Sequence, residues 1–145
     1  MHQFRTKGAV LKALLEHQID YFSKFAQDYL AEIGAGQPEA QLSAEIATLR
    51  EVATNPHSVA FAIVGALAEE PGLLSITREG EVEAIERIKA GAADPDLAML
   101  RWAAARGLAL SALFGLYALP EEDRERLFER LLDNRQWAAF TKADQ

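Results

Sequence analysis

The stretch DPDLAMLRWAAARGLALSALFGLYAL, residues 94–119, decides the fold of this chain. Its Asp94–Pro95 pair is typical of a helix start, because the aspartate can cap free backbone N–H groups and proline fits the first helical turn. Beyond that first turn the stretch carries charge only at Arg101 and Arg106. We therefore predict a helix over about 95–118 that is apolar nearly all round, and such a helix has to be covered on more than one side.

A membrane span is the first alternative for this helix. Its uncharged run over residues 107–119 has 13 residues, whereas a span needs about 20. We therefore predict that the helix lies between the core of its own subunit and a partner subunit. Small residues along it would allow two backbones to approach closely, and these are Ala103, Ala104, Ala105, Gly107 and Ala109.

Glycine and proline residues divide the rest of the chain into five further helical segments, so we predict an all-α fold of six helices in one domain. These segments lie at about 6–33, 38–54, 55–70, 73–89 and 120–134. Thr6 is the predicted N-cap of the first, which carries a mostly apolar stripe at steps of three and four residues. Three acidic residues, 121–123, suit the start of the last helix, because they face the positive end of the helix dipole.

Composition limits the classes of protein that remain. The chain has 145 residues, 50% of them hydrophobic, and a formal net charge of −7. That length and apolar content suffice for one compact domain. An acidic surface repels phosphates, so we predict that this chain alone binds nucleic acid poorly. The absence of cysteine excludes disulfides and thiolate metal sites and fits a cytoplasmic location.

Residue patterns typical of catalysis are missing from the sequence. The histidines, His2, His17 and His57, do not have the spacing of helical metal ligands, and there is no Glu-x-x-His pair. A nucleophile elbow, a phosphate-binding glycine loop and a dinucleotide fingerprint are also absent. We therefore predict no catalytic residues, no metal and no cofactor, and a small helical-bundle enzyme is the least favoured alternative.

Aromatic residues at helical spacing favour a small-molecule pocket. A bundle cavity lined by aromatic side chains with a few polar groups is typical of a ligand site, and the alternative is that these side chains fill the core. Two arginines also need partners on an apolar helix. Arg101 and Arg106 are predicted to form salt bridges across a dimer seam or to bind an acidic effector. The candidate effector-binding residues are His17, Tyr21, Phe22, Phe25, Tyr29, His57, Phe61, Trp102, Arg106, Phe114 and Tyr117.

The first 18 residues, MHQFRTKGAVLKALLEHQ, resemble the junction between the recognition helix and the long connecting helix of TetR-family regulators. Phe4 and Lys7 match the fixed Phe and Lys of that pattern. The residues that match its apolar run are Ala9, Val10, Leu11 and Leu14. The chain departs from the pattern at Met1 and His2, where the family usually has an aromatic pair, and at Gly8, where an acidic residue is common.

The resemblance implies an effector-binding and dimerisation domain over residues 6–145, with residues 1–5 a remnant of the recognition helix of a helix-turn-helix. It also implies that Lys7 contacts a DNA phosphate. In the family the last two helices form a four-helix bundle with the same pair of a second subunit. The interface candidates are Leu97, Leu100, Arg101, Ala104, Leu108, Ser111, Leu127, Phe128, Leu131 and Leu132.

These features together predict the ligand-sensing, homodimeric part of a TetR-type repressor that a small apolar or aromatic effector releases from operator DNA. The resemblance places the DNA-reading module before residue 6, so this chain alone is not expected to bind an operator, and no membrane partner is expected. The alternative is a stand-alone helical protein–protein interaction domain that docks through Trp137 and Phe140.

Overall fold

The computed structural model describes residues 2–55, 59–60, 62–65, 72, 74–115 and 119–141. Over these residues the chain is helical and has no strand, which confirms the predicted all-α class. Its helices are α1 (His2–Ile33), α2 (Ala40–Thr54), α4 (Leu74–Ala90), α5 (Pro95–Phe114), α6 (Glu121–Leu132) and α7 (Asn134–Ala138). Two short helical stretches, 59–60 and 62–65, lie between α2 and α4.

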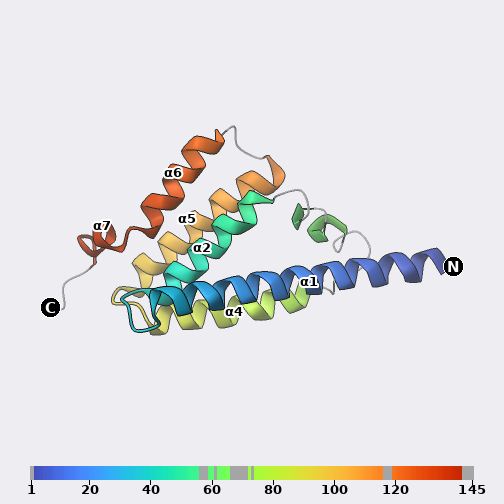
Figure 1. Cartoon of the computed structure of the whole chain (residues 1–145), viewed down its shortest axis with the longest axis horizontal. Helices are drawn as coiled ribbons and strands as arrows, with labels where there is room; N and C mark the ends of the chain where they lie inside the picture. The colour runs from blue at the N-terminus through green and yellow to red at the C-terminus, as the bar shows by residue number, and fades with distance from the viewer. Residues whose placement is uncertain are drawn as a thin grey trace.

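Helix α2 is the centre of the arrangement. It packs against α1, α4, α5 and α6, so most of its small and apolar side chains are buried. Figure 1 shows α1 as a long straight helix whose N-terminal end projects beyond the other helices. Helices α2, α5 and α6 follow one another across the body of the fold, and the short α7 leads to the C-terminus (Figure 1).

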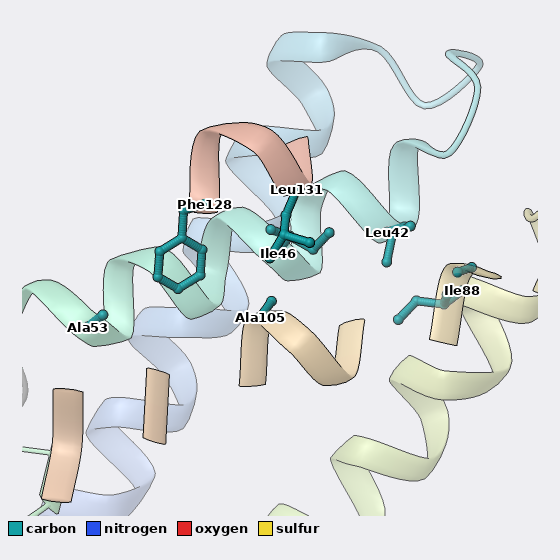
Figure 2. Packing of buried hydrophobic residues seen from close by; sticks show 8 residues of the cluster. Leu42, Ile46, Ala53, Ile88, Ala105, Phe128 and Leu131 are labelled. Carbon is teal, nitrogen blue, oxygen red and sulfur yellow. The ribbon is translucent and has the colours of Figure 1, made fainter. Parts of the chain in front are cut away.

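The core consists of apolar side chains from α2, α4, α5 and α6. Leu42 and Ile46 of α2 meet Phe128 of α6, and all three are almost completely buried. Figure 2 shows the ring of Phe128 over α2, with Ala105 of α5 close by. Ile88 brings α4 into the same cluster. One continuous core therefore fixes the mutual positions of the four helices that surround the candidate sites.

Helix α5 begins as predicted and ends earlier than predicted. The Asp94 carboxylate accepts a hydrogen bond from the backbone N–H of Leu97 at 3.2 Å, and Pro95 occupies the first turn. The helix ends at Phe114, because Gly115 adopts the left-handed conformation (φ 60°) and its N–H bonds to the Ser111 carbonyl at 3.0 Å. The prediction that the helix continues to 118 is therefore wrong.

Helix α1 begins before its predicted start. It starts at His2, so Thr6 lies inside the helix and the prediction that Thr6 is its N-cap is wrong. Gly8 also lies inside, because a single glycine costs only about 1 kcal/mol within a long helix. Asn55, the predicted cap of the third helix, instead follows the last residue of α2, and its N–H bonds to Val52.

The C-terminal tail contains a helix that the sequence pattern did not indicate. Asp133 accepts a hydrogen bond from the backbone N–H of Arg135 at 3.2 Å and so caps the short α7. The indole N–H of Trp137 donates to the carbonyl of Arg130 at 2.7 Å. Trp137 is thereby held against the core, while Phe140 remains 68% exposed.

Among the described residues, α5 is long and apolar enough to cross a membrane by length and composition alone. In the fold it packs against α2, α4 and α6, and its Arg101 is buried among protein partners. We interpret it as a core helix with one uncovered face.

Candidate ligand pocket and subunit interface

One face of α5 is apolar and exposed. Leu100 is 68% exposed, and Leu110 and Phe114 are each 39% exposed. With Ala103 and Gly107 they recur at steps of three and four residues, the spacing of a helix–helix seam. A Cβ atom added to Gly107 would meet nothing within 4 Å in this chain. We call these five residues the α5 stripe, and a second backbone could approach closely at its small middle positions.

The predicted interface residues divide into exposed and buried groups. Leu100, Ala104 and Leu127 are exposed and can face a partner. Leu97, Leu108 and Leu132 are half-buried. The remaining four are buried inside the single chain, because α6 and α7 cover them or because they belong to the core, and these are Arg101, Ser111, Phe128 and Leu131. The predicted interface residues that a second subunit could contact therefore lie on the exposed face of α5 and the adjoining edge of α6.

Arg101 joins α5 to the C-terminal end of the chain. It is 3% exposed, and its guanidinium donates hydrogen bonds to the carbonyl of Leu131 and, at 2.8 Å, to the side-chain oxygen of Asn134. Its guanidinium carbon lies 5.4 Å from the centre of the Trp137 ring. Burial lowers the pKa of Arg101, and the carboxylates of Glu39 and Asp133 oppose that shift. Arg101 thus finds its partners within its own subunit rather than across a dimer seam.

Asn134 extends this network to the start of α2. Its amide nitrogen donates to the hydroxyl of Ser43 at 3.1 Å and to the carbonyl of Pro38 at 3.3 Å. Ser43 is 4% exposed. One asparagine therefore connects residues nearly a hundred positions apart in the sequence, and it positions α7 against α2 and α5.

A pocket of about 260 Å³ lies beside this network. Its lining includes Glu39, Leu97, Arg101, Asn134 and Trp137. The Glu39 carboxylate accepts a hydrogen bond from the backbone N–H of Ala93 at 3.1 Å through Oε1, whereas its buried Oε2 has no hydrogen-bond partner. The buried Nε of Arg101 has none either. The sequence pattern singled out Arg101 of this lining as a charge on an apolar helix, and it indicated no role for Glu39 or Asn134.

Arg106 is also paired within the chain. Its guanidinium forms an ion pair with Glu81, which connects α5 to α4. The guanidinium carbon of Arg106 lies 4.9 Å from the centre of the Trp102 ring. Burial lowers the pKa of Arg106. This pairing assigns Arg106 a structural role, because its charge is already compensated by a protein carboxylate.

Helix α1 packs against α2, and it carries four of the predicted effector-binding aromatic residues. Phe22, Phe25 and Tyr29 are half-buried. Tyr21 is 50% exposed, and its hydroxyl donates to Glu51 of α2 at 3.0 Å. That hydrogen bond, together with the negative charge of Glu51, raises the pKa of Tyr21.

Three other predicted effector-binding residues, His17, Trp102 and Phe114, belong to the described part of the chain. His17 is exposed on α1, and Phe114 belongs to the α5 stripe. Trp102 is half-buried beside Arg106 and packs against the core cluster. His57, Phe61 and Tyr117 lie outside the described residues, as does the side chain of Lys7.

The N-terminal half of α1 is held by the short helical stretch that follows α2. Leu11 and Leu15 are buried, at 4% and 5% exposure. A Cβ atom on Gly65 would lie 2.6 Å from a methyl group of Leu11, so the missing side chain allows this close packing. Residue 65 of this stretch therefore packs directly against α1.

Among the residues that the structure describes, no group of three or more His, Asp or Glu side chains is placed to hold a metal ion. Glu45 of α2 instead pairs with Arg87 of α4 at 3.7 Å. Burial raises the pKa of Glu45, and Arg87 opposes that shift.

A comparison with protein families gives a match over most of the chain. The family model described as "Tetracyclin repressor-like, C-terminal domain" matches residues 39–134. The match spans α2 to the beginning of α7 and so includes the whole core cluster. No curated protein and no solved structure matches the chain significantly.

Proposed function

Because the chain belongs to the family of tetracyclin repressor-like C-terminal domains, we propose that it is the effector-binding and dimerising part of a cytoplasmic TetR-type repressor. The family is a regulatory one, and its C-terminal domains pair with a second subunit and bind small molecules. In this proposal α1 carries movement from the effector site to a DNA-reading module on its N-terminal side. Lys7, near the start of α1, contacts a phosphate of the operator.

The observation that carries the dimer part of the proposal is the α5 stripe. An exposed apolar row at steps of three and four residues is costly on an isolated domain and is typical of a surface that a second helix covers. Leu127 extends the apolar face onto α6, since it is 36% exposed. We propose that α5 and α6 of two subunits form an intersubunit four-helix bundle through these residues.

Replacement of Leu100 with glutamate is expected to weaken dimerisation about 100-fold or more, which corresponds to about 2.7 kcal/mol. The change puts a charge into the centre of the proposed seam, and it leaves the monomer fold intact because Leu100 is 68% exposed. Sedimentation equilibrium of the wild type and the variant measures the effect. Val82→Glu is the matched control, because Val82 is an equally apolar residue, 56% exposed, on α4. A monomeric wild type at micromolar concentration, or equal behaviour of the two variants, contradicts the proposal.

A second pair of variants distinguishes the effect of lost close packing on dimerisation from the effect of an added charge. Gly107 and Gly80 both lie within helices and both have room for a side chain in the monomer. Gly107→Leu therefore disrupts the dimer by filling the seam, whereas Gly80→Leu leaves the dimer unchanged. A normal dimer in Gly107→Leu would exclude close approach of the two α5 helices.

The effector part of the proposal concerns the aromatic side chains of α1. Phe22, Phe25 and Tyr29 are half-buried on a helix that packs against α2, and apolar side chains with a phenol among them suit a small aromatic ligand. Leu11 and Gly65 join the same helix to the stretch that follows α2. A ligand at this contact would therefore shift α1 itself.

A thermal-shift screen of small aromatic compounds tests this part, because a ligand that binds the folded state stabilises it by mass action, by about 2.7 kcal/mol at 100 times its Kd. We expect Phe25→Leu to remove most of the stabilisation that such a compound gives to the wild type. Phe140→Leu, on an exposed tail residue, is expected to retain it. Full stabilisation in Phe25→Leu would show that the effector binds elsewhere.

A further inference from the structure

The exposed side of α5 has a pattern that is symmetrical about Gly107. Leu100 and Phe114 lie seven positions before and after this glycine, and both are exposed. Ala104 and Leu110 lie three positions before and after it, and they are exposed as well. In a twofold-symmetric pair of identical chains, residue i contacts residue j and residue j contacts residue i. A pattern with this symmetry therefore matches itself when a second α5 lies against it in the opposite direction.

The two subunits of the proposed dimer could place their α5 helices in the same direction or in opposite directions. We propose that the two α5 helices pack antiparallel, with their closest approach at Gly107. Leu100 then faces Phe114 of the partner subunit, and Ala104 faces Leu110 of the partner subunit. This orientation and register rest on the proposed dimer, which by itself leaves both open.

Side-chain sizes along α5 favour the antiparallel direction. In a helix–helix seam, a side chain inserts into a hole between four residues of the facing helix. Ala103, Ala104 and Gly107 form three sides of such a hole, and Leu100 completes it. An antiparallel partner places its Leu110 over this hole and fills it. A parallel partner places leucine against leucine at position 110 and alanine against alanine at position 104, which crowds one level of the seam and leaves another empty.

The charge at the beginning of α5 favours the same direction. Asp96 is exposed, and it lies one helical turn before Leu100 on the same face of the helix. A parallel pair would bring the two Asp96 carboxylates together at one end of the seam, where they repel each other. In the antiparallel pair they are about 33 Å apart along the seam, because each lies 11 residues from Gly107 and a helix rises about 1.5 Å per residue.

Introduced cysteines report the register directly, because the chain has none of its own. Ala104→Cys and Leu110→Cys face each other in the antiparallel pair, whereas each lies about 9 Å along the seam from its own copy. After subunit exchange and oxidation, an equal mixture of the two variants is expected to give about fivefold more disulfide-linked dimer than either variant alone, because a disulfide needs Cα atoms about 4.4–6.8 Å apart. A non-reducing gel measures the linked dimer. Val10→Cys, at an exposed residue of α1, is the control for linkage by random collision.

Paired charges test the same register without a covalent bond. Leu100→Glu and Phe114→Lys are each expected to weaken the dimer alone. In their antiparallel heterodimer the introduced glutamate faces the introduced lysine, and the other end of the seam keeps the wild-type pair. Sedimentation equilibrium of an equal mixture is therefore expected to show a dimer at least about tenfold tighter than that of either variant, which corresponds to about 1.4 kcal/mol. The matched control is a mixture of Leu100→Glu with Phe114→Glu, in which like charges meet and no gain is expected.

Three results would overturn the proposed register in a wild type that is dimeric. The first is linkage of Ala104→Cys or Leu110→Cys alone that equals linkage in their mixture, since this indicates a parallel pair. The second is linkage in the mixture no greater than that of Val10→Cys. The third is equal dimerisation of the lysine and glutamate mixtures. A monomeric wild type would instead overturn the proposed dimer itself, so the two failures are distinguishable.

Discussion

Replacement of Phe128 with alanine is expected to destabilise the domain by about 3–5 kcal/mol, because it removes a fully buried ring from the core and leaves a cavity. Phe128 is 0% exposed and packs from α6 against Leu42 and Ile46 of α2. The loss is measured by urea unfolding, in a Leu100→Glu background so that dimerisation does not contribute to the free energy of unfolding.

Phe140→Ala is the control for this prediction. Phe140 is the same residue type on the C-terminal side of α7, but it is 68% exposed, so the expected change is within about 0.5 kcal/mol. A loss of less than 1 kcal/mol for Phe128→Ala would mean that α6 is not an integral part of the core. It would then also weaken the proposed role of α6 in the subunit interface.

Replacement of Arg101 with methionine is expected to cost about 2–4 kcal/mol, and to loosen α6 and α7 first. Methionine fills much of the same volume, but the carbonyl of Leu131 and the side-chain oxygen of Asn134 lose their donors. A buried acceptor without a partner costs about 1–3 kcal/mol. The arginine charge no longer has to be buried, which offsets only part of this cost, because one buried and one part-buried acceptor are left without a donor.

The location of this effect distinguishes Arg101 from an ordinary stabilising residue. Hydrogen exchange is expected to accelerate at the backbone amides of α7 and at the end of α6, before global unfolding. Arg106→Met is the matched control, because its ion pair with Glu81 is one-third exposed on both sides and such pairs contribute about 1 kcal/mol or less. Equal losses for the two arginines, or exchange that is unchanged in α7, would contradict the role of Arg101 as the connection to the C-terminal helices.

The sequence was sufficient to predict where helices α5 and α6 begin, because the interactions that start a helix join residues within one turn. Asp94 and Pro95 start α5 as predicted, because a cap and a proline act within one turn. The acidic residues 121–123 occupy the first turn of α6 for the same reason. The end of α5 was missed by several residues, since the pattern of apolar residues continues past Gly115 and only the left-handed conformation of that glycine stops the helix.

The partners of the polar residues could not be predicted, because they depend on contacts between distant segments. Arg101 bonds to residues 30 and 33 positions away, and Glu39 bonds to Ala93, 54 positions away. The sequence indicated that both arginines on α5 need partners, and it left a dimer seam and an acidic effector as the alternatives. The tertiary structure turns Arg101 toward α6 and α7 and Arg106 toward α4.

The sequence by itself therefore determined that the chain is all-α and that residues 94–119 contain a helix too apolar to stand alone. These features follow from composition, periodicity and capping, which are properties of neighbouring residues. The resemblance of the first 18 residues to a TetR-type junction was also visible in the sequence alone. The tertiary structure alone decided which face of that helix remains uncovered and which residues enclose the pocket at Glu39 and Arg101. Both depend on how α2, α6 and α7 pack against α5, and packing joins residues that the sequence keeps far apart.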